Sequence, residues 1–332
     1  MSEKLGIDAT RRRLCAGLGV CAGLGLANDG LPRWLGGSLF DDLSYRDTLS
    51  LLDQSLSDAQ RSHIVLPYDD PSRQITNTTV VHTGPHISTL LSPQQVELAR
   101  HLYKTMLSAS GYELFRNTVG LEGKFEGSSL KFYSDGADLA SSNDSVVMFN
   151  GGHFMLRMAQ GRDQNHVFGG PISYGQQIGN NRFKVQGNAF KLHGDAANDL
   201  HASLTNEQRD QAYQVGPPME LVTQVQGESG EFKGLAFAQL SESQLELAKQ
   251  ALKVIFSAYP AQQQRDAFTA IENNGGIQAL NLSLYKDFAF YQNGDRLADL
   301  SDAQISTKED AYVQVWRIEG PGCVLHLSLI HI

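Results

Sequence analysis

LSPQQVELARHLYKTMLSASG (residues 91–111) shows how this chain divides into helices and strands. Ser92 followed three residues later by Gln95 is the capping-box pattern, in which each side chain bonds a backbone N–H at a helix start. Pro93 occupies the first helical position, where its missing N–H costs nothing. Apolar residues then recur at helical spacing until Gly111, a residue typical of helix ends. The stretch therefore predicts a helix that begins at Pro93.

The pentapeptide Leu-Ser/Thr-x-x-Gln occurs five times. Its copies are LSDAQ (56–60), LSPQQ (91–95), LTNEQ (204–208), LSESQ (240–244) and LSDAQ (300–304). Helical patterns follow the first four, whereas the fifth precedes a strand-like segment and is predicted to form a turn. The spacing between copies is irregular, which excludes a solenoid. We interpret the pentapeptide as a device that starts helices, and not as a functional motif.

Strand patterns lie between the predicted helices. Alternating β-branched and aromatic residues mark TVVHT (79–83), SVVMF (145–149), HFMLRM (153–158) and YVQVWRIEG (312–320). Asn150-Gly151-Gly152 predicts a hairpin turn between the second and third of these. Strands are few and do not alternate regularly with helices, so we expect an α+β fold with helices packed around a mainly antiparallel β-sheet. Residues 28–326 contain no linker-like stretch, which predicts a single globular domain.

The composition limits the classes of function. The 332 residues carry a formal net charge of −9 and are 41% hydrophobic and 19% charged, as in soluble globular proteins. An acidic chain without a basic stripe argues against a nucleic-acid or anionic-lipid partner. The sequence also contains no Walker loop, dinucleotide fingerprint, haem-attachment motif or Gly-x-Ser-x-Gly elbow. A small molecule remains the expected partner.

Residues 1–27 differ in character from the rest. Arg11, Arg12 and Arg13 precede a glycine-rich apolar run that is too short to span a bilayer comfortably. We interpret 1–27 as a twin-arginine-type export signal, which predicts a periplasmic or secreted protein without a membrane span after signal removal. The alternatives are a disordered basic tail and a lipid anchor on Cys21.

The other end of the chain is also unusual. LSLIHI (327–332) matches a translation of a common sequencing adapter, so we expect these residues to be read-through and the natural C-terminus to be missing. The alternative is a genuine apolar strand end.

Three histidines are candidate metal ligands. His153 follows a glycine pair, His166 lies in NHVFGGP, and His326 is predicted to end the strand that contains Trp316 and Glu319. Together with Glu319 or Glu122 they would make a suitable ligand set for a divalent transition metal such as zinc or iron. The alternative is that each histidine is a structural or surface group, because no HxH, HxxxH or HExxH spacing is present.

Two arginines inside apolar strands are candidate catalytic residues. If Arg157 and Arg317 point inward, each needs a carboxylate partner. That partner is either a substrate carboxylate, which the guanidinium would bind bidentately, or a structural acid such as Glu122 or Glu319. We therefore count all four residues as candidates. Asp69-Asp70 with Arg73 is either a metal or ion-pair cluster or a solvated turn.

The order of these motifs resembles one family. The matching stretches are LSDAQRSHIVLPYDDPSR (56–73), LLSPQQVELARHLYKTMLSASGYE (90–113), Leu121-Glu122, NGGHFMLRM (150–158), LTNEQRDQA, LSESQLELA and VWRIEGPGCVLH (315–326). Together they resemble the family known as Domain of Unknown Function 3500 over nearly all of residues 28–326. The family's paired histidines appear here as His153-Phe154, and its members continue past the Gly-Pro turn into a histidine-containing strand. The resemblance implies no reaction.

Two functional hypotheses follow from these observations. The first is an exported, metal-assisted hydrolase or oxidoreductase that acts on a small molecule. The second is an exported ligand-binding or structural protein without catalysis.

Overall fold

The structure is a computed structural model of the chain, and its described part contains two sheets with helices. It describes residues 40–74, 84–122, 125–136, 138–140, 145–151, 154–160, 173–174, 191–216, 225–286, 289–290, 312–313 and 315–328. All described helices and strands lie within one compact unit, Leu43–Ile332.

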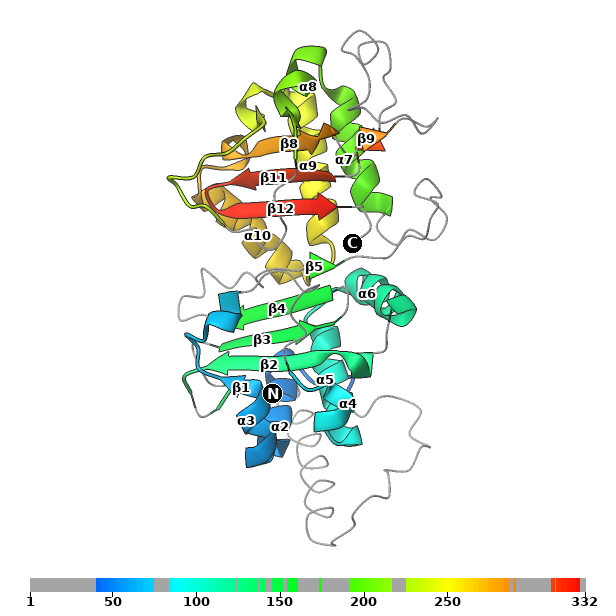
Figure 1. The fold of residues 1–332 in the computed structure, drawn as a ribbon, viewed down its shortest axis with the longest axis vertical. Coiled ribbons are helices and arrows are strands. Elements are labelled where there is room, and N and C mark those ends of the chain that lie inside the picture. The colour runs from blue at the N-terminus through cyan, green and yellow to red at the C-terminus, as the bar shows by residue number, and fades with distance from the viewer. Residues whose placement is uncertain are drawn as a thin grey trace, which may run out of the picture. The chain divides into compact units, whose positions relative to one another are not determined.

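The first group of elements, which we call module 1, runs from α2 to β5 (Figure 1). Its helices are α2 (Tyr45–Ser55), α3 (Asp58–Ile64), α4 (Ile87–Leu90), α5 (Pro93–Thr105) and α6 (Ala109–Glu122). Its strands are β1 (Val65–Leu66), β2 (Ser129–Ser134), β3 (Ser145–Asn150), β4 (Phe154–Gln160) and β5 (Ser173–Tyr174). The strands form one sheet in chain order, in which β1 is parallel to β2 and the other pairs are antiparallel.

The second group, module 2, runs from α7 to β12. Its helices are α7 (Lys191–Ser203), α8 (Asn206–Ala212), α9 (Glu242–Phe256) and α10 (Ala261–Asn273). Its strands are β6 (Tyr213–Gln214), β7 (Leu235–Ala236), β8 (Asn281–Tyr285), β11 (Val315–Gly320) and β12 (Cys323–Ser328), and a separate ribbon pairs β9 (Ala289–Phe290) with β10 (Tyr312–Val313). In the main sheet β6 is parallel to β8, whereas β8–β11 and β11–β12 are antiparallel.

The modules share one plan. Each begins with a helix, a capped short helix and a short strand that joins the sheet in parallel (α2–α3–β1 and α7–α8–β6). Each continues with a second capped helix and its successor, then an antiparallel three-strand meander (α5–α6 with β2–β3–β4, and α9–α10 with β8–β11–β12). The first four pentapeptides therefore form two pairs, one in each module. The two members of a pair start 35 residues apart in module 1 (56 to 91) and 36 residues apart in module 2 (204 to 240).

Four pentapeptides form complete capping boxes, which confirms their predicted role. The two boxes of each module also join through their glutamines. The Gln60 Nε2 donates to the Gln95 Oε1 at 2.9 Å, and the Gln95 Nε2 donates back at 3.1 Å. The Gln208 Nε2 and the Gln244 Oε1 make the same pair at 3.1 Å, with the return bond at 2.8 Å. The fifth pentapeptide lies outside the described residues.

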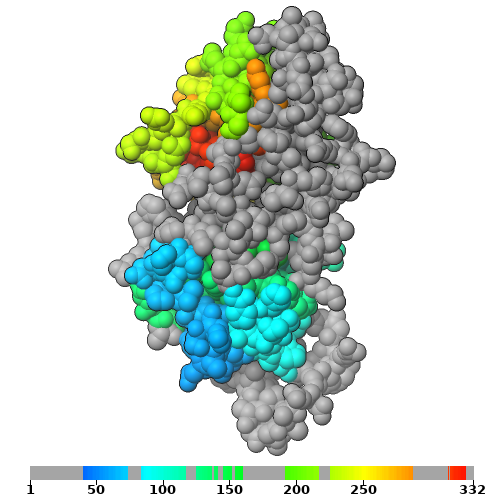
Figure 2. Space-filling view, in the orientation of Figure 1, coloured from blue at the N-terminus to red at the C-terminus, as the bar shows by residue number. Residues whose placement is uncertain are grey.

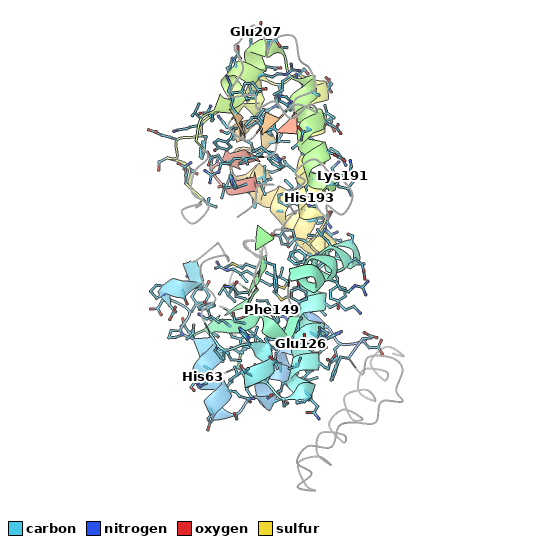
Figure 3. All side chains as sticks on the ribbon, turned by 45° about the vertical axis from the view of Figure 1, so that its right-hand side comes forward. His63, Glu126, Phe149, Lys191, His193 and Glu207 are labelled. Atoms are coloured by element: carbon cyan, nitrogen blue, oxygen red, sulfur yellow. The ribbon has the colours of Figure 1, made fainter. Side chains whose placement is uncertain are left out.

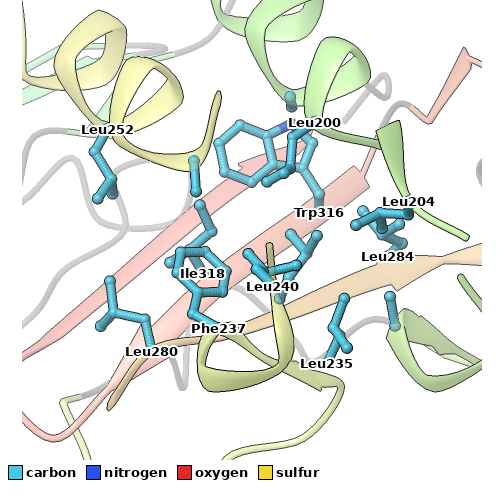
Figure 4. Packing of buried hydrophobic residues seen from close by; sticks show 14 of the residues in the cluster. Leu200, Leu204, Leu235, Phe237, Leu240, Leu252, Leu280, Leu284, Trp316 and Ile318 are labelled. Atoms are coloured by element: carbon cyan, nitrogen blue, oxygen red, sulfur yellow. The ribbon is translucent and has the colours of Figure 1, made fainter. Parts of the chain in front are cut away.

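Each sheet has one face in contact with helices. In module 1, the Tyr103 ring of α5 packs against Phe149 of β3 and Phe154 of β4, with ring centroids 5.4 and 5.7 Å apart. Figure 3 places Phe149 in the packed interior of this module and His63 on its outside. In module 2, Trp316 and Ile318 of β11 pack with side chains of α7 and α9 (Figure 4). Burying these apolar side chains holds helices and sheet together.

The predicted fold class is confirmed, and the structure adds detail to it. The predicted strands 145–149, 153–158 and 312–320 correspond to β3, β4 and β10–β11, whereas 79–83 lies outside the described residues. The Gly151 N–H donates to the Phe154 carbonyl at 2.8 Å in the predicted hairpin. The expected sheet is divided between two modules, and the strands missing from the prediction include β2, β8 and β12. His326 therefore lies on β12, across a turn from β11, and the prediction that it ends the strand of Trp316 was wrong. Within the suspected read-through, Leu327 and Ser328 continue β12 and pair with Trp316 and Val315.

Candidate functional site

The face of each sheet opposite the helices, which we call the outer face, carries polar and charged side chains, and in module 1 these lie beside a buried apolar cluster of Tyr133, Val146, Met148 and Met155. Side chains alternate along a strand, and cross-strand partners share a face. In module 1 the row Lys131–Met148–Arg157 therefore lies on the outer face, and in module 2 the row Ser283–Arg317–His326 does. Charged groups that are buried on such strands need a partner of opposite charge in the protein or in a ligand.

Arg157 is the central cation of the module 1 outer face. Its Nη1 donates to the carbonyl of Arg73 at 2.8 Å, while its Nε is buried and makes no hydrogen bond to any described residue. Burial lowers the Arg157 pKa, and the nearby positive charge of Arg73 lowers it further. No described carboxylate forms an ion pair with Arg157, so a structural acid does not account for it within the described part of the chain.

Arg73 comes from the segment that follows β1. Its guanidinium lies 4.2 Å from the centroid of the Tyr68 ring, and its Nε donates to the Tyr68 carbonyl. Cation–π stacking and this hydrogen bond hold the side chain in one place. Figure 2 shows residues 40–74, in shades of blue, beside green and cyan surface of the same module. Arg157 bonds the backbone of Arg73, and the charges of these two residues, distant in sequence, interact at the outer face.

A hydrogen-bonded chain fixes the segment that carries Arg73. The Asp70 Oδ1 accepts from the Ser72 backbone N–H at 2.8 Å and from the Ser72 hydroxyl at 2.5 Å. The Ser72 hydroxyl lies 3.0 Å from the hydroxyl of Tyr133, a fully buried residue of β2. The bonds from Ser72 lower the Asp70 pKa, and burial raises the Tyr133 pKa. Asp70 therefore stabilises the turn in which it lies. This agrees with the turn alternative for Asp69-Asp70 with Arg73.

The outer face of module 2 is balanced in charge. The Arg317 Nη1 lies 3.4 Å from the Glu319 Oε2, and both side chains are buried. The Gln226 Nε2 donates to the same carboxylate oxygen at 3.2 Å. For Arg317 the structural-acid alternative is therefore the one that the geometry supports, because an acid of its own strand lies beside it.

His326 lies across from Arg317 in the register of β11 and β12. Burial, followed by the positive charge of Arg317, lowers the pKa of His326 to about 4. The Tyr285 ring stands at 6.3 Å from the imidazole, and burial raises the Tyr285 pKa. The imidazole is therefore neutral at neutral pH, and its buried Nδ1 makes no hydrogen bond to the described residues.

The remaining predicted site residues are not brought into these clusters by the described structure. Glu122 ends α6, but its side chain is not described, and His153 and His166 lie outside the described residues. The described residues contain no group of three His, Cys, Asp or Glu that could hold a metal ion. None of the described helices has the length and apolar character that a membrane crossing requires.

Sequence patterns alone missed part of the module 1 cluster. Lys131 and Tyr133 lie on β2, which was not predicted, and Ser72 was not singled out. Burial lowers the Lys131 pKa, with Asp70 as its nearby negative charge. The available signal was the run PYDDPSR (67–73), which combines turn formers with charges of both signs directly after a strand.

The comparisons with known proteins agree with the resemblance seen in the motifs. No curated protein and no solved structure matches the chain. One family model matches residues 46–284, from α2 to β8, and so covers the Arg73 and Arg157 cluster but ends before Arg317. This match spans well over half of the 332 residues. The chain belongs to the family described as Protein of unknown function (DUF3500).

Proposed function

We propose that the protein binds a small anionic molecule at the outer face of module 1. The observation that carries the proposal is Arg157, a largely buried cation that adjoins a second arginine and no described carboxylate. Burying a charge is costly unless a counter-charge is supplied. A carboxylate or phosphate group of a ligand supplies it, and the planar guanidinium suits both.

The surroundings of Arg157 support a preformed site. Arg73 is held by the Tyr68 ring and carbonyl, and its segment is tied to the sheet through Ser72 and Tyr133. Because these groups are already ordered, little conformational entropy is lost when a ligand binds. The chain as a whole is acidic, at −9, so the positive charge is local to this face. Binding without catalysis is therefore the function that we favour.

Isothermal titration of the full-length protein with inorganic phosphate and with succinate, at constant ionic strength, tests the proposal. Arg157→Met keeps an unbranched side chain but removes the guanidinium, and we expect it to abolish binding of whichever anion the wild type takes. Arg116→Met is the matched control, because Arg116 is exposed on α6. Wild-type protein that takes up neither anion, or equal binding by both variants, would overturn the proposal.

The second candidate is a metal-assisted hydrolase or oxidoreductase. It is favoured by His326, whose imidazole is neutral and has a buried Nδ1 without a hydrogen bond to the described residues, as a metal ligand requires. Glu319 lies on the same face, and His153 and His166 remain predicted ligands. Elemental analysis of full-length protein and of His326→Ala tests it: a stoichiometric metal that the variant loses supports the enzyme, and equal metal content in both excludes this site.

We also propose export by the twin-arginine route to the periplasm or the medium. The support is the arginine run at residues 11–13 before a glycine-rich apolar stretch. Changing Arg11, Arg12 and Arg13 to Lys should retain the protein in the cytoplasmic fraction of a bacterial host. An unchanged distribution between fractions would contradict this route.

A further inference from the structure

The two modules match in sequence as well as in plan. LSPQQVELARHLYKTMLSA (91–109) and LSESQLELAKQALKVIFSA (240–258) are identical at nine of nineteen positions without a gap. LSDAQRSHIVL (56–66) and LTNEQRDQAYQ (204–214) share Leu, Gln and Arg and place their parallel strands at the same offset from the cap. The shared core of elements, its pairing and this identity together indicate that the chain is a tandem duplication, to which α4, β5, β7 and the β9–β10 ribbon are additions.

Strand register then gives the equivalent positions on the two outer faces. In each module the middle strand and the last strand form a hairpin, and counting from the turn pairs β3 with β11 and β4 with β12. The equivalent residues are Tyr133 and Tyr285, Met148 and Arg317, Asn150 and Glu319, and Arg157 and His326. The buried tyrosine is the same in both, whereas the charges around it differ.

The charge differs at three of these four pairs, Met148 and Arg317, Asn150 and Glu319, and Arg157 and His326, and also at the equivalent pair Lys131 and Ser283. In module 1, Arg157 adjoins Arg73, and the amide Asn150 stands near the turn. In module 2, the equivalent of Asn150 is Glu319, which pairs with Arg317, and the equivalent of Arg157 is His326, an imidazole in place of a guanidinium. The module 1 face therefore carries three cations, Arg157, Arg73 and Lys131, with Asp70 near Lys131, whereas on the module 2 face the charge of Arg317 is offset by the adjacent Glu319 carboxylate.

We propose that Glu319 and His326 are the specificity-determining residues that confine anion binding to module 1, and that module 2 holds the same site with its affinity for anions switched off. This rests on the proposed function of module 1. A carboxylate within 3.4 Å of Arg317 competes for the guanidinium edge that an anion would occupy, and repels the anion itself. The imidazole of His326 stands where module 1 has the guanidinium of Arg157, which can donate two parallel hydrogen bonds to an anion.

The test installs the residues of module 1 at the equivalent positions of module 2. In the full-length double variant Glu319→Asn with His326→Arg, titration with inorganic phosphate should show a stoichiometry that rises from one to two. A matched control is Glu242→Asn with Gln250→Arg, which makes the same change in net charge at exposed positions of α9 and should keep one equivalent. An unchanged stoichiometry in the double variant, or an equal gain in the control, would overturn the inference.

Folding and the proposed function are tested separately. Near-UV circular dichroism reports whether the double variant is packed, and the isosteric Glu319→Gln is the milder second variant, expected to gain a weaker second equivalent. Because a ligand that binds only the native state raises its melting temperature, phosphate should raise Tm more in the variants than in wild type. If wild type binds no phosphate but the double variant binds one equivalent, the proposed function fails and the role of Glu319 and His326 stands.

Discussion

Modules 1 and 2 use one architecture for two different surfaces. Both keep the paired glutamines at the helix starts and a buried tyrosine on the second strand of the sheet. They differ in the charges of the outer face and in the side chains that fill the core, where Val147 of one corresponds to Trp316 of the other. What the modules share serves folding, whereas what distinguishes them is where candidate function lies.

The largest expected difference between the modules is in core packing. Trp316 and Val147 occupy equivalent positions, and each is 1% exposed. Trp316→Ala should lower the free energy of unfolding by about 3–5 kcal/mol, because it removes a large side chain and leaves a cavity. Val147→Ala should cost roughly 2 kcal/mol, in proportion to its smaller buried area. Urea denaturation measures the free energy of unfolding of both variants. Equal losses of stability would contradict the expected difference between the two cores at this position.

The second difference appears in acid. His201 of α7 and Asp53 of α2 are equivalent positions, three residues before the leucine of each pentapeptide. Burial, followed by the charge of Arg209, lowers the His201 pKa to about 4, whereas burial raises the Asp53 pKa. Since the unfolded chain binds the histidine proton below about pH 6.5, stability contributed by His201 is complete above that pH and is lost as the pH falls toward 4, by about 3 kcal/mol in all. The contribution of Asp53 changes with pH in the opposite direction. Because its pKa is raised in the folded protein, its ionisation lowers the free energy of unfolding as the pH rises.

Hydrogen exchange at pH 7 and pH 5 checks this contrast. Amides of α7 and α8 should lose protection at the lower pH before those of α2 and α3 do. His201→Gln retains a side chain that can bond the Tyr213 hydroxyl and should flatten the pH dependence, whereas the exposed His63→Gln should not. Simultaneous loss of protection in both modules would show that they unfold as one unit.

The smallest expected difference concerns the paired glutamines, for which the modules should agree. Gln95→Leu removes the bond to the Ser55 carbonyl at 2.7 Å, and Gln244→Leu removes the same bond to Ser203 at 2.7 Å. Each should cost about 1 kcal/mol, since a part-buried carbonyl loses its hydrogen-bond donor. Double-mutant cycles with Gln60→Leu and Gln208→Leu should give a coupling of about 1 kcal/mol in each module. A coupling in only one module would show that the two glutamine pairs are not equivalent.

Local patterns predicted the helices well, because a capping box and an apolar stripe lie within a few residues of each other. The pentapeptides at 56, 91, 204 and 240 all start helices as predicted. The site was harder to predict. Arg157 contacts the backbone of Arg73 because β1 pairs with β2, β2 with β3 and β3 with β4, and no pattern in a single strand specifies the long-range pairing of β1 with β2. The Arg317–Glu319 pair was foreseen as one alternative because its partners lie two residues apart on one strand.

The reciprocal glutamine pairs have a consequence for how the chain reaches its native state. Each glutamine amide carries both a donor and an acceptor, so any two of them can pair. The same reciprocal geometry therefore allows Gln60 to bond Gln244 in place of Gln95. Helices as similar as α5 and α9 therefore create a hazard of exchange between modules during folding, a failure typical of repeated sequences. Synthesis from the N-terminus reduces it, since residues 45–160 emerge before α9 exists. The mismatch in volume between Val147 and Trp316 opposes exchange afterwards, because a helix fitted to one core leaves voids or clashes on the other.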